Sequence, residues 1–168
     1  VFRDWPYLYD GNPAEEEAYL RSYRDRSGAI LIAARDGDRM VGCATGMPLA
    51  GHEDARDVPL VDLGLSMEDV FYCAESVLLP DYRGQGAGHS FFDRREDHAR
   101  ALGYGTSMFC GVERPNHHPL RPDGVRPLAP FWKKRGYRAR DAHIRMDWTD
   151  RGETAPTEKL LRVWTLSL

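Results

Sequence analysis

A cluster of glycines carries the clearest chemical signal in the chain. The segment "RGQGAGH", residues 83–89, follows an apolar run and opens a charged stretch with helical spacing. Glycine lets backbone N–H groups approach a ligand closely, and a helix N-terminus adds partial positive charge. The segment lacks the lysine of a Walker loop and the spacing of a dinucleotide fingerprint. The sequence therefore indicates a phosphate-binding turn, with a simple tight turn as the alternative.

One carboxylate interrupts the apolar run before this turn. Glu75 stands within "FYCAESVLL", where burial of an unpaired charge would cost several kcal/mol. Burial in general raises the pKa of a carboxyl group toward neutrality, which suits a general base. We therefore interpret Glu75 as the candidate base, with Tyr72 as a rival position. An edge-facing glutamate, or one paired with a core arginine, would explain the residue without chemistry.

Two further side chains could transfer protons or attack a substrate. Cys110 lies in the apolar run "TSMFCGV", and His117 stands beside His118 in a proline-rich loop. Together they would suit a Cys–His nucleophilic enzyme, although that function leaves the glycine turn unexplained. A small buried hydrophobe and two surface polar residues are the simpler explanations. No metal-ligand spacing joins the histidines to other ligands, so we expect no metal site.

Helices and strands must alternate to position these residues. Asn12 and Pro13 are typical of a helix start, and this helix is expected to reach about Arg26. Two β-rich runs around "DGD" predict a hairpin. We further expect strands at 69–79, 105–112, 137–148 and 158–168, helices at 88–102 and 128–135, and irregular connections at 48–68 and 115–130. One apolar stripe should line the longer helix, formed by Phe91, Phe92, Arg95, Ala99 and Leu102.

The composition fits one domain over residues 1–168. Hydrophobic residues make up 42% of the chain, and the formal net charge of −3 gives no reason to expect nucleic acid or membrane as a partner. Three cysteines without a C-x-x-C pair argue against a secreted disulfide framework and favour the cytoplasm. No apolar stretch approaches the roughly 20 residues that a membrane span needs.

Two motifs resemble the GNAT N-acetyltransferase superfamily. "VLLPDYRGQGAGHSFF" is similar to the family signature [QR]-x-x-G-x-[GA], which Arg83, Gly84, Gln85, Gly86, Ala87 and Gly88 fulfil. "LAPFWKKRGY" resembles the later helix-and-glycine element. The likeness covers roughly residues 29–148, and it implies an α/β (α+β) fold. The implied sheet is mixed and mostly antiparallel, is flanked by helices, and has fourth and fifth strands that splay apart.

The resemblance also implies a cosubstrate, acetyl-CoA, held in the gap between the splayed strands. Carried over to this chain, the backbone at Val77, Leu78 and Leu79 would pair with pantetheine amides, and the N–H groups from Arg83 to His89 would bind pyrophosphate. The implied reaction is direct attack of a primary amine, from a small molecule or a peptide, on the thioester. A non-catalytic acyl-CoA sensor or scaffold is the alternative, and a homodimer is compatible with the sequence.

One position departs from the family pattern. The usual acid, a tyrosine in the later helix, is replaced by Trp132, so the proton would come from Cys110, His117 or His118, or the thiolate would leave unassisted. "KKR" at 133–135 could reach the ribose phosphate, although an exposed helix face explains it as well. The amine should approach from the opposite side, where candidate walls are the loop 48–68, Trp5, Tyr7, Tyr9 and Trp132, with Asp4, Asp10 and Glu75 as acidic neighbours.

The start of the chain also differs from the family pattern. A GNAT sheet opens with a strand and a helix before the element that matches the helix at Asn12. The few residues before Asn12 resemble only the loop after that unit. We therefore expect the encoded protein to be longer than this chain by tens of residues, and this domain to lack its first strand and helix.

Overall fold

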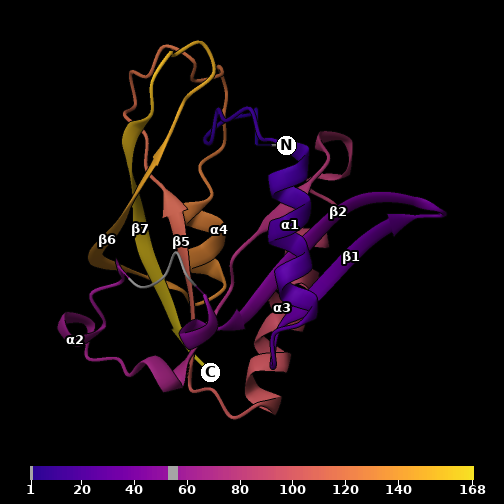
Figure 1. Ribbon diagram of the computed structural model, residues 1–168, viewed down its shortest axis with the longest axis vertical. Coiled ribbons are helices and arrows are strands. Elements are labelled where there is room, and N and C mark those ends of the chain that lie inside the picture. The colour runs from indigo at the N-terminus through magenta and orange to yellow at the C-terminus, as the bar shows by residue number, and fades with distance from the viewer. Residues whose placement is uncertain (1, 53–56) are drawn as a thin grey trace.

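The computed structural model describes residues 2–52 and 57–168, which form one mixed α/β structure (Figure 1). Its longer helices are α1 (Pro13–Arg24) and α3 (Ala87–Ala101). Shorter helices and single turns are η1 (Leu49–Gly51), α2 (Leu60–Leu63), η3 (Met67–Asp69), η4 (Pro80–Tyr82) and α4 (Ala129–Lys134). The strands are β1 (Ile30–Asp36), β2 (Arg39–Pro48), β3 (Val70–Tyr72), β4 (Ser76–Leu78), β5 (Thr106–Val112), β6 (Arg138–Trp148) and β7 (Thr157–Ser167). No helix of the described residues is both long and apolar enough to cross a membrane.

The strands form a sheet with two halves. The order is β1-β2-β3-β5-β7-β6, and β4 lies off this path because it pairs with β2. β3 and β5 are parallel, whereas the other pairs are antiparallel. Figure 1 shows β5, β7 and β6 on one side and the β1–β2 hairpin on the other. The predicted mixed, mostly antiparallel sheet is therefore confirmed.

The strand predicted at 69–79 is broken into β3 and β4 by a bulge. β2 pairs Met47 with Tyr72, but it pairs Ala44 with Ser76, so β2 has two residues between these pairs where the facing chain has three. Thr45 faces two residues at once: its N–H donates to Glu75 O at 3.0 Å, and its carbonyl accepts from Ala74 N at 3.1 Å. An extra residue of this kind bends a strand and turns its side chains.

The bulge marks the point where the two halves of the sheet part. Cys73 N donates to Met108 O at 2.7 Å and extends the β3–β5 ladder by one bond. Beyond that bond β4 pairs with β2, and within the described residues it has no ladder with β5. A gap between β4 and β5 follows, as expected for the splayed fourth and fifth strands of the resemblance.

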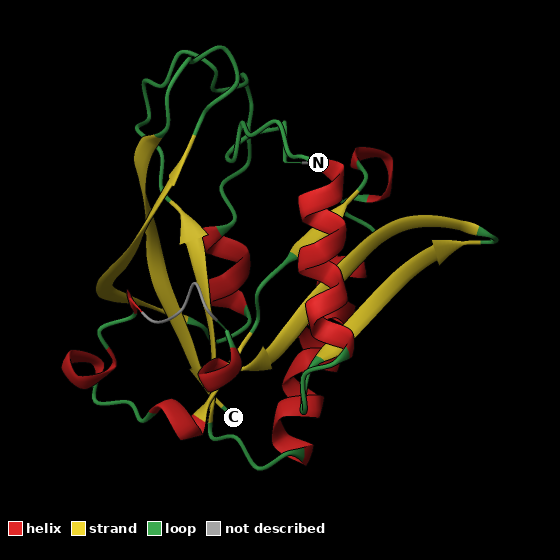
Figure 2. Cartoon of the chain, in the orientation of Figure 1, coloured by secondary structure: helices red, strands yellow, loops and turns green. Residues whose placement is uncertain are grey.

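The helices cover the sheet in two layers. Figure 2 shows α1 in front of the β1–β2 hairpin and α3 behind it. The side chains of Phe91, Phe92, Arg95 and Ala99 on α3 are buried, as predicted. Leu102 is 47% exposed, so its place in the predicted stripe was wrong. The reason is that the helix ends at Ala101, with Leu102 as its C-cap.

Two hydrophobic clusters lie against opposite faces of β5. Met108 belongs to the first cluster, with Tyr72 and Val163, whereas Phe109 belongs to the second, with Phe92 and Trp164. This alternation follows from the strand period of two residues. Side chains on the two faces of β5 therefore contact different clusters, so residues beside opposite faces do not share one site.

Candidate active site

The glycine turn presents a row of backbone donors before α3. Gly84 and Gly86 have φ of 77° and 93°, a left-handed conformation that favours glycine, and a Cβ at either would meet open space. The N–H of Arg83 donates to Pro80 O at 3.1 Å. The N–H groups of residues 84–89 have no hydrogen-bond acceptor within the described part of the chain. This is the geometry of an anion-binding turn.

The backbone of β4 has one side toward β2 and one toward the gap. Glu75 O accepts from Thr45 N, and Leu79 N donates to Val41 O at 2.9 Å. Since successive residues of an antiparallel pair alternate in direction, the backbone groups of Val77 and Leu79 face β2. Those of Ser76 and Leu78 face away from it. Of the three residues taken for pantetheine, only Leu78 thus has its backbone groups turned from β2, and Ser76 shares that orientation.

The N-terminal segment, residues 2–10, crosses the open end of the gap. On the β5 side, Arg114 donates to the carbonyls of Pro6 and Tyr7, each at 2.8 Å, and Trp148 Nε1 donates to Tyr7 O at 2.9 Å. On the β4 side, the Asp4 carboxylate lies 3.6 Å from the Arg83 guanidinium. Arg83 Nε also donates to Leu78 O at 3.1 Å. The segment is visible at the top of Figure 1, between the β5–β7–β6 half and the start of α1.

A buried ion pair anchors this segment. Arg114 holds Asp150 through two bonds, at 2.6 and 2.8 Å, and both side chains are buried. Lys159 Nζ lies 3.5 Å from the same carboxylate. Burial raises the pKa of Asp150, but the hydrogen bonds and charge of Arg114 and Lys159 outweigh burial and bring the pKa below its ordinary value. The anchor is therefore fully formed only while Asp150 is ionised.

Four polar side chains gather where β3 and β5 part. Glu75 lies close enough to Tyr7 and Tyr72 to raise the pKa of both phenols, although burial is the larger cause for each. Tyr72 and Cys110 also lie near each other across the parallel pair, and each affects the pKa of the other. Burial raises the pKa of the Cys110 thiol to about 12, although the neighbouring Tyr72 hydroxyl lowers it. Around neutral pH the two phenols and the thiol are consequently protonated.

The histidines lie outside this group. His117 is exposed in the loop after β5, and no interaction within the described residues links it to Cys110 or Glu75. His118 Nε2 lies 3.8 Å from Asp150 Oδ2, and its ring packs edge-on against Trp5 at 5.4 Å. A shallow hollow of about 490 Å³ near them is lined only by residues of their own loop, 116–125. No contact within the described residues thus supports the predicted Cys–His pair.

Trp132 faces the second hydrophobic cluster. Its ring lies 4.9 Å from Phe109 and 5.0 Å from Trp164, and a Cβ at Gly111 would come within 2.8 Å of it. Cys110 points to the other face of β5. The tryptophan therefore cannot form one wall with Tyr7 and Tyr9, which was one expectation for the acceptor site.

The three basic residues after Trp132 differ in their surroundings. Arg135 is bound by Glu96 at 3.0 Å and Asp93 at 2.7 Å, and it also donates to His89 Nδ1 at 3.1 Å. Its side chain is buried, so it is not placed to reach a ribose phosphate. Lys133 and Lys134 are exposed.

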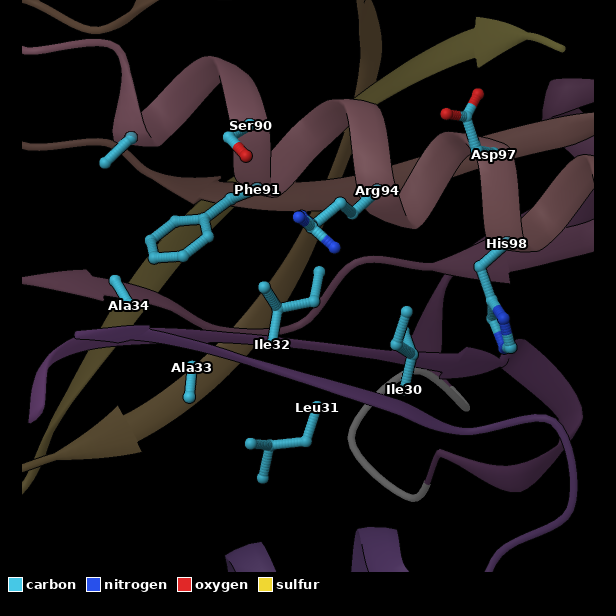
Figure 3. A pocket seen from close by; sticks show the side chains of 11 residues that line it. Ile30, Leu31, Ile32, Ala33, Ala34, Ser90, Phe91, Arg94, Asp97 and His98 are labelled. Atoms are coloured by element: carbon cyan, nitrogen blue, oxygen red, sulfur yellow. The ribbon is translucent and has the colours of Figure 1, made fainter.

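A further hollow lies away from this site. A groove of about 710 Å³ runs between β1 and α3 and includes, of the predicted cofactor residues, only Ala87. Figure 3 shows Phe91 and Arg94 extending from α3 toward β1 in this groove, Phe91 toward Ala34 and Arg94 toward Ile32. Within the described residues, no cluster of three His, Cys, Asp or Glu side chains could hold a metal ion.

The split sheet with a glycine turn at the start of α3 defines the class as the GNAT fold. The chain belongs to the GNAT acetyltransferase family, since the model of the "Acetyltransferase (GNAT) family" matches residues 2–121. No curated protein sequence matches the chain.

Solved structures support the same fold. An aminoglycoside 6'-N-acetyltransferase complexed with coenzyme A has a TM-score of 0.59 and 15% identity, over 99% of this chain and 86% of that one. A GNAT acetyltransferase from Elizabethkingia anophelis with acetyl-CoA bound has a TM-score of 0.55 and 14% identity, over 97% and 90%. A GCN5-related N-acetyltransferase from Kribbella flavida has a TM-score of 0.56 and 17% identity, over 95% and 80%. At these identities the likeness shows the fold alone.

Several residues of the site were missed in the sequence. The bulge before β4 sets which side the backbone groups of Ser76 and Leu78 face, and no residue type in "CAES" signals that bulge. Arg114 follows a strand, as many surface arginines do, and nothing nearby reveals its distant partner Asp150. The contact of Asp4 with Arg83 likewise joins two separate segments that look unremarkable in the sequence.

Proposed function

We propose that this protein transfers an acetyl group from acetyl-CoA to a primary amine of a small molecule or peptide. The observation that carries the proposal is the gap between β4 and β5, which ends at the N–H groups of residues 84–89, six donors without an acceptor among the described residues. An open row of donors at a helix start suits a pyrophosphate, and backbone groups along the gap suit the amides of pantetheine. The arrangement therefore fits coenzyme A.

The directions of the backbone groups in β4 and in the glycine turn indicate which residues would hold the cosubstrate. The N–H groups of Gly84, Gln85, Gly86, Ala87, Gly88 and His89 would bind the pyrophosphate. The backbone of Ser76 and Leu78 would pair with pantetheine, whereas Val77 and Leu79 would keep β4 attached to β2. Arg83 lies beside the turn and supplies positive charge. When bound, acetyl-CoA supplies a thioester carbonyl carbon as the electrophile.

Glu75 would act as general base in this reaction. The amine nitrogen forms a bond to the thioester carbonyl carbon, the carbon–sulfur bond breaks, and the carboxylate of Glu75 takes the proton that nitrogen loses. The thiolate then takes a proton from solvent. Tyr7, protonated and close to Glu75, and Cys110, protonated and close to Tyr7, would donate hydrogen bonds to the charge that develops. We assign no step to His117.

Thiol release tests this proposal. The chain should release free thiol when mixed with acetyl-CoA and at least one amine of a broad panel, and it should release little without an amine. Mass spectrometry of the amine should show the added acetyl group. Thiol release without an acetylated amine would contradict N-acetyl transfer.

A sensor that binds acyl-CoA without turnover is the second candidate function. The observation that favours it is Trp132, packed into the second cluster where the family has a tyrosine. A thermal shift with acetyl-CoA, combined with no thiol release for any amine, would support the sensor.

A further inference from the structure

Arg95 is a fully buried cation beneath the bulge of the sheet. Its side chain on α3 is 1% exposed. Nη1 donates to Glu75 O at 3.0 Å and to Thr45 O at 3.2 Å, and Nε donates to Phe91 O at 3.2 Å. The two carbonyls bound by Nη1 belong to the two strands that the bulge joins.

These bonds complete the hydrogen bonding of the bulge. Thr45 already binds Ala74 and Glu75 through its own backbone, and its hydroxyl accepts from Glu75 N at 3.0 Å. Arg95 adds one donor to each carbonyl from the side of α3. A register slip of one residue would turn the following side chains to the other face. Arg95 therefore holds the backbone at Thr45 and Glu75, and this backbone determines the direction in which the Glu75 side chain points.

Stability alone gives no reason for an arginine at this position. No carboxylate within the described residues pairs with Arg95, and its buried Nη2 has no hydrogen-bond partner there. The Phe92 ring, 4.7 Å from the guanidinium carbon, offsets part of the cost of burial. An apolar side chain of similar volume would avoid that cost. The bonds to the bulge are what such a side chain could not supply.

We propose that Arg95 is a positioning residue of the active site, which holds the bulge so that the carboxylate of Glu75 points to the reacting amine. The inference rests on the proposed acetyl transfer and on Glu75 as its base. Arg95 itself touches neither substrate. It acts from the α3 face, whereas Glu75 reaches the tyrosines at the mouth of the gap.

Two variants test this role from opposite sides of the bulge. Arg95→Met removes the donors and keeps an apolar chain, and Thr45→Val removes the hydroxyl that accepts from Glu75 N with almost no change of shape. Arg94→Met is the matched control, because Arg94 is the exposed neighbour in the groove of Figure 3. Each change is made in the wild-type chain and in Glu75→Gln, and kcat is measured after circular dichroism confirms folding.

If the two variants act by displacing Glu75, their losses of kcat should not add to the loss caused by Glu75→Gln. Arg95→Met and Thr45→Val should each lower kcat, by up to about 10²-fold for a shift near 1 Å, and the loss should nearly vanish in Glu75→Gln. Arg94→Met should leave kcat unchanged in both backgrounds. Should Arg95→Met fail to fold, Thr45→Val alone decides. Equal losses of kcat in the wild-type and Glu75→Gln backgrounds, or no loss in either, would overturn the inference about Arg95. The proposed function would still hold in that case, provided that the wild-type chain acetylates an amine. A wild-type chain without turnover would overturn both.

Discussion

The carboxylate of Asp4 and the guanidinium of Arg83 lie 3.6 Å apart, and they join the N-terminal segment to the turn before α3. The pair places a negative charge near the donors proposed for pyrophosphate. Both side chains are about half exposed, so the pair contributes little to stability, about 1 kcal/mol at most.

Asp4→Asn should therefore strengthen coenzyme A binding, because it removes a repulsive charge and frees Arg83. We expect the Kd to fall by a few-fold at low salt, and the gain to shrink at high salt through screening. Isothermal titration at two salt concentrations measures it. Asp10→Asn is the control, since Asp10 pairs with Arg3 in the same segment. A fall of Kd as large in the control would refute the link to Arg83.

Gly86→Asp should abolish the thermal shift that coenzyme A produces. The substitution adds a side chain and a like charge where the phosphate is proposed to lie, at a φ of 93°. Gly103→Asp is a matched control, because Gly103 has φ of 87° and equally open space at the far end of α3. The control should keep the shift. Retention of the shift in Gly86→Asp would disprove the assignment of the turn.

Glu75→Gln should slow turnover while coenzyme A binding stays the same, because the cosubstrate is held mainly by backbone groups. General-base catalysis typically contributes about 10²- to 10⁴-fold, and kcat should fall within that range. The acidic limb of the pH profile of kcat/KM should flatten as well. A variant within about threefold of wild type would leave Glu75 a structural carboxylate and direct attention to Tyr72.

Arg114→Met should destabilise the chain by about 3–5 kcal/mol, since it leaves Asp150 buried without its main partner. Urea unfolding near pH 7 measures the loss. Arg145→Met is the control: its pair with Glu158 is exposed, and the loss should stay within about 1 kcal/mol.

The pH dependence of this loss follows from Asp150. Its pKa is lower in the folded chain than the ordinary value near 3.9, so the anchor contributes stability above that value. The contribution disappears as the pH falls through the folded pKa. The difference between wild type and Arg114→Met should therefore shrink in acid. A constant difference down to low pH would show that the charge of Asp150 is not involved.

The thiols should react slowly in the folded chain. Burial raises the pKa of Cys110 to about 12 and also raises that of Cys43, and the side chain of Cys73 is 1% exposed. Reaction with a disulfide reagent near pH 7.5 should be much slower than in denaturant. Cys110→Ser should also keep kcat within about threefold, which a nucleophilic cysteine would not allow. Fast labelling of Cys110 would contradict its burial.

The sequence predicted the fold well where local patterns determine it. The cap at Asn12, the hairpin around "DGD" and the glycine turn all rest on neighbouring residues, and each forms as expected: Asn12 accepts from Ala14 N at 3.0 Å. The bulge at Glu75 could not be predicted, because it depends on pairing with Thr45 in another strand and on Arg95 in a later helix.

The site shows the same division. Candidates within the glycine turn needed only the local chain, and the structure places them together. Cys110 and His117 were paired by chemistry alone: Cys110 packs beside the first hydrophobic cluster, whereas His117 is exposed, and no contact within the described residues joins them. Arg95 was assigned to an apolar stripe, and its burial is confirmed, but hydrophobic spacing does not reveal that its guanidinium binds backbone carbonyls.

The sheet order has a consequence for synthesis on the ribosome. β5 lies between β3 and β7, and β7 is translated later than β5 and β6. The β1–β2–β4 half and α3 can assemble early, whereas one edge of β5 must wait for its neighbour. An unpaired strand edge invites pairing with other chains. Nascent chains that stall before residue 157 would therefore expose the unpaired edge of β5, which other chains or chaperones could bind.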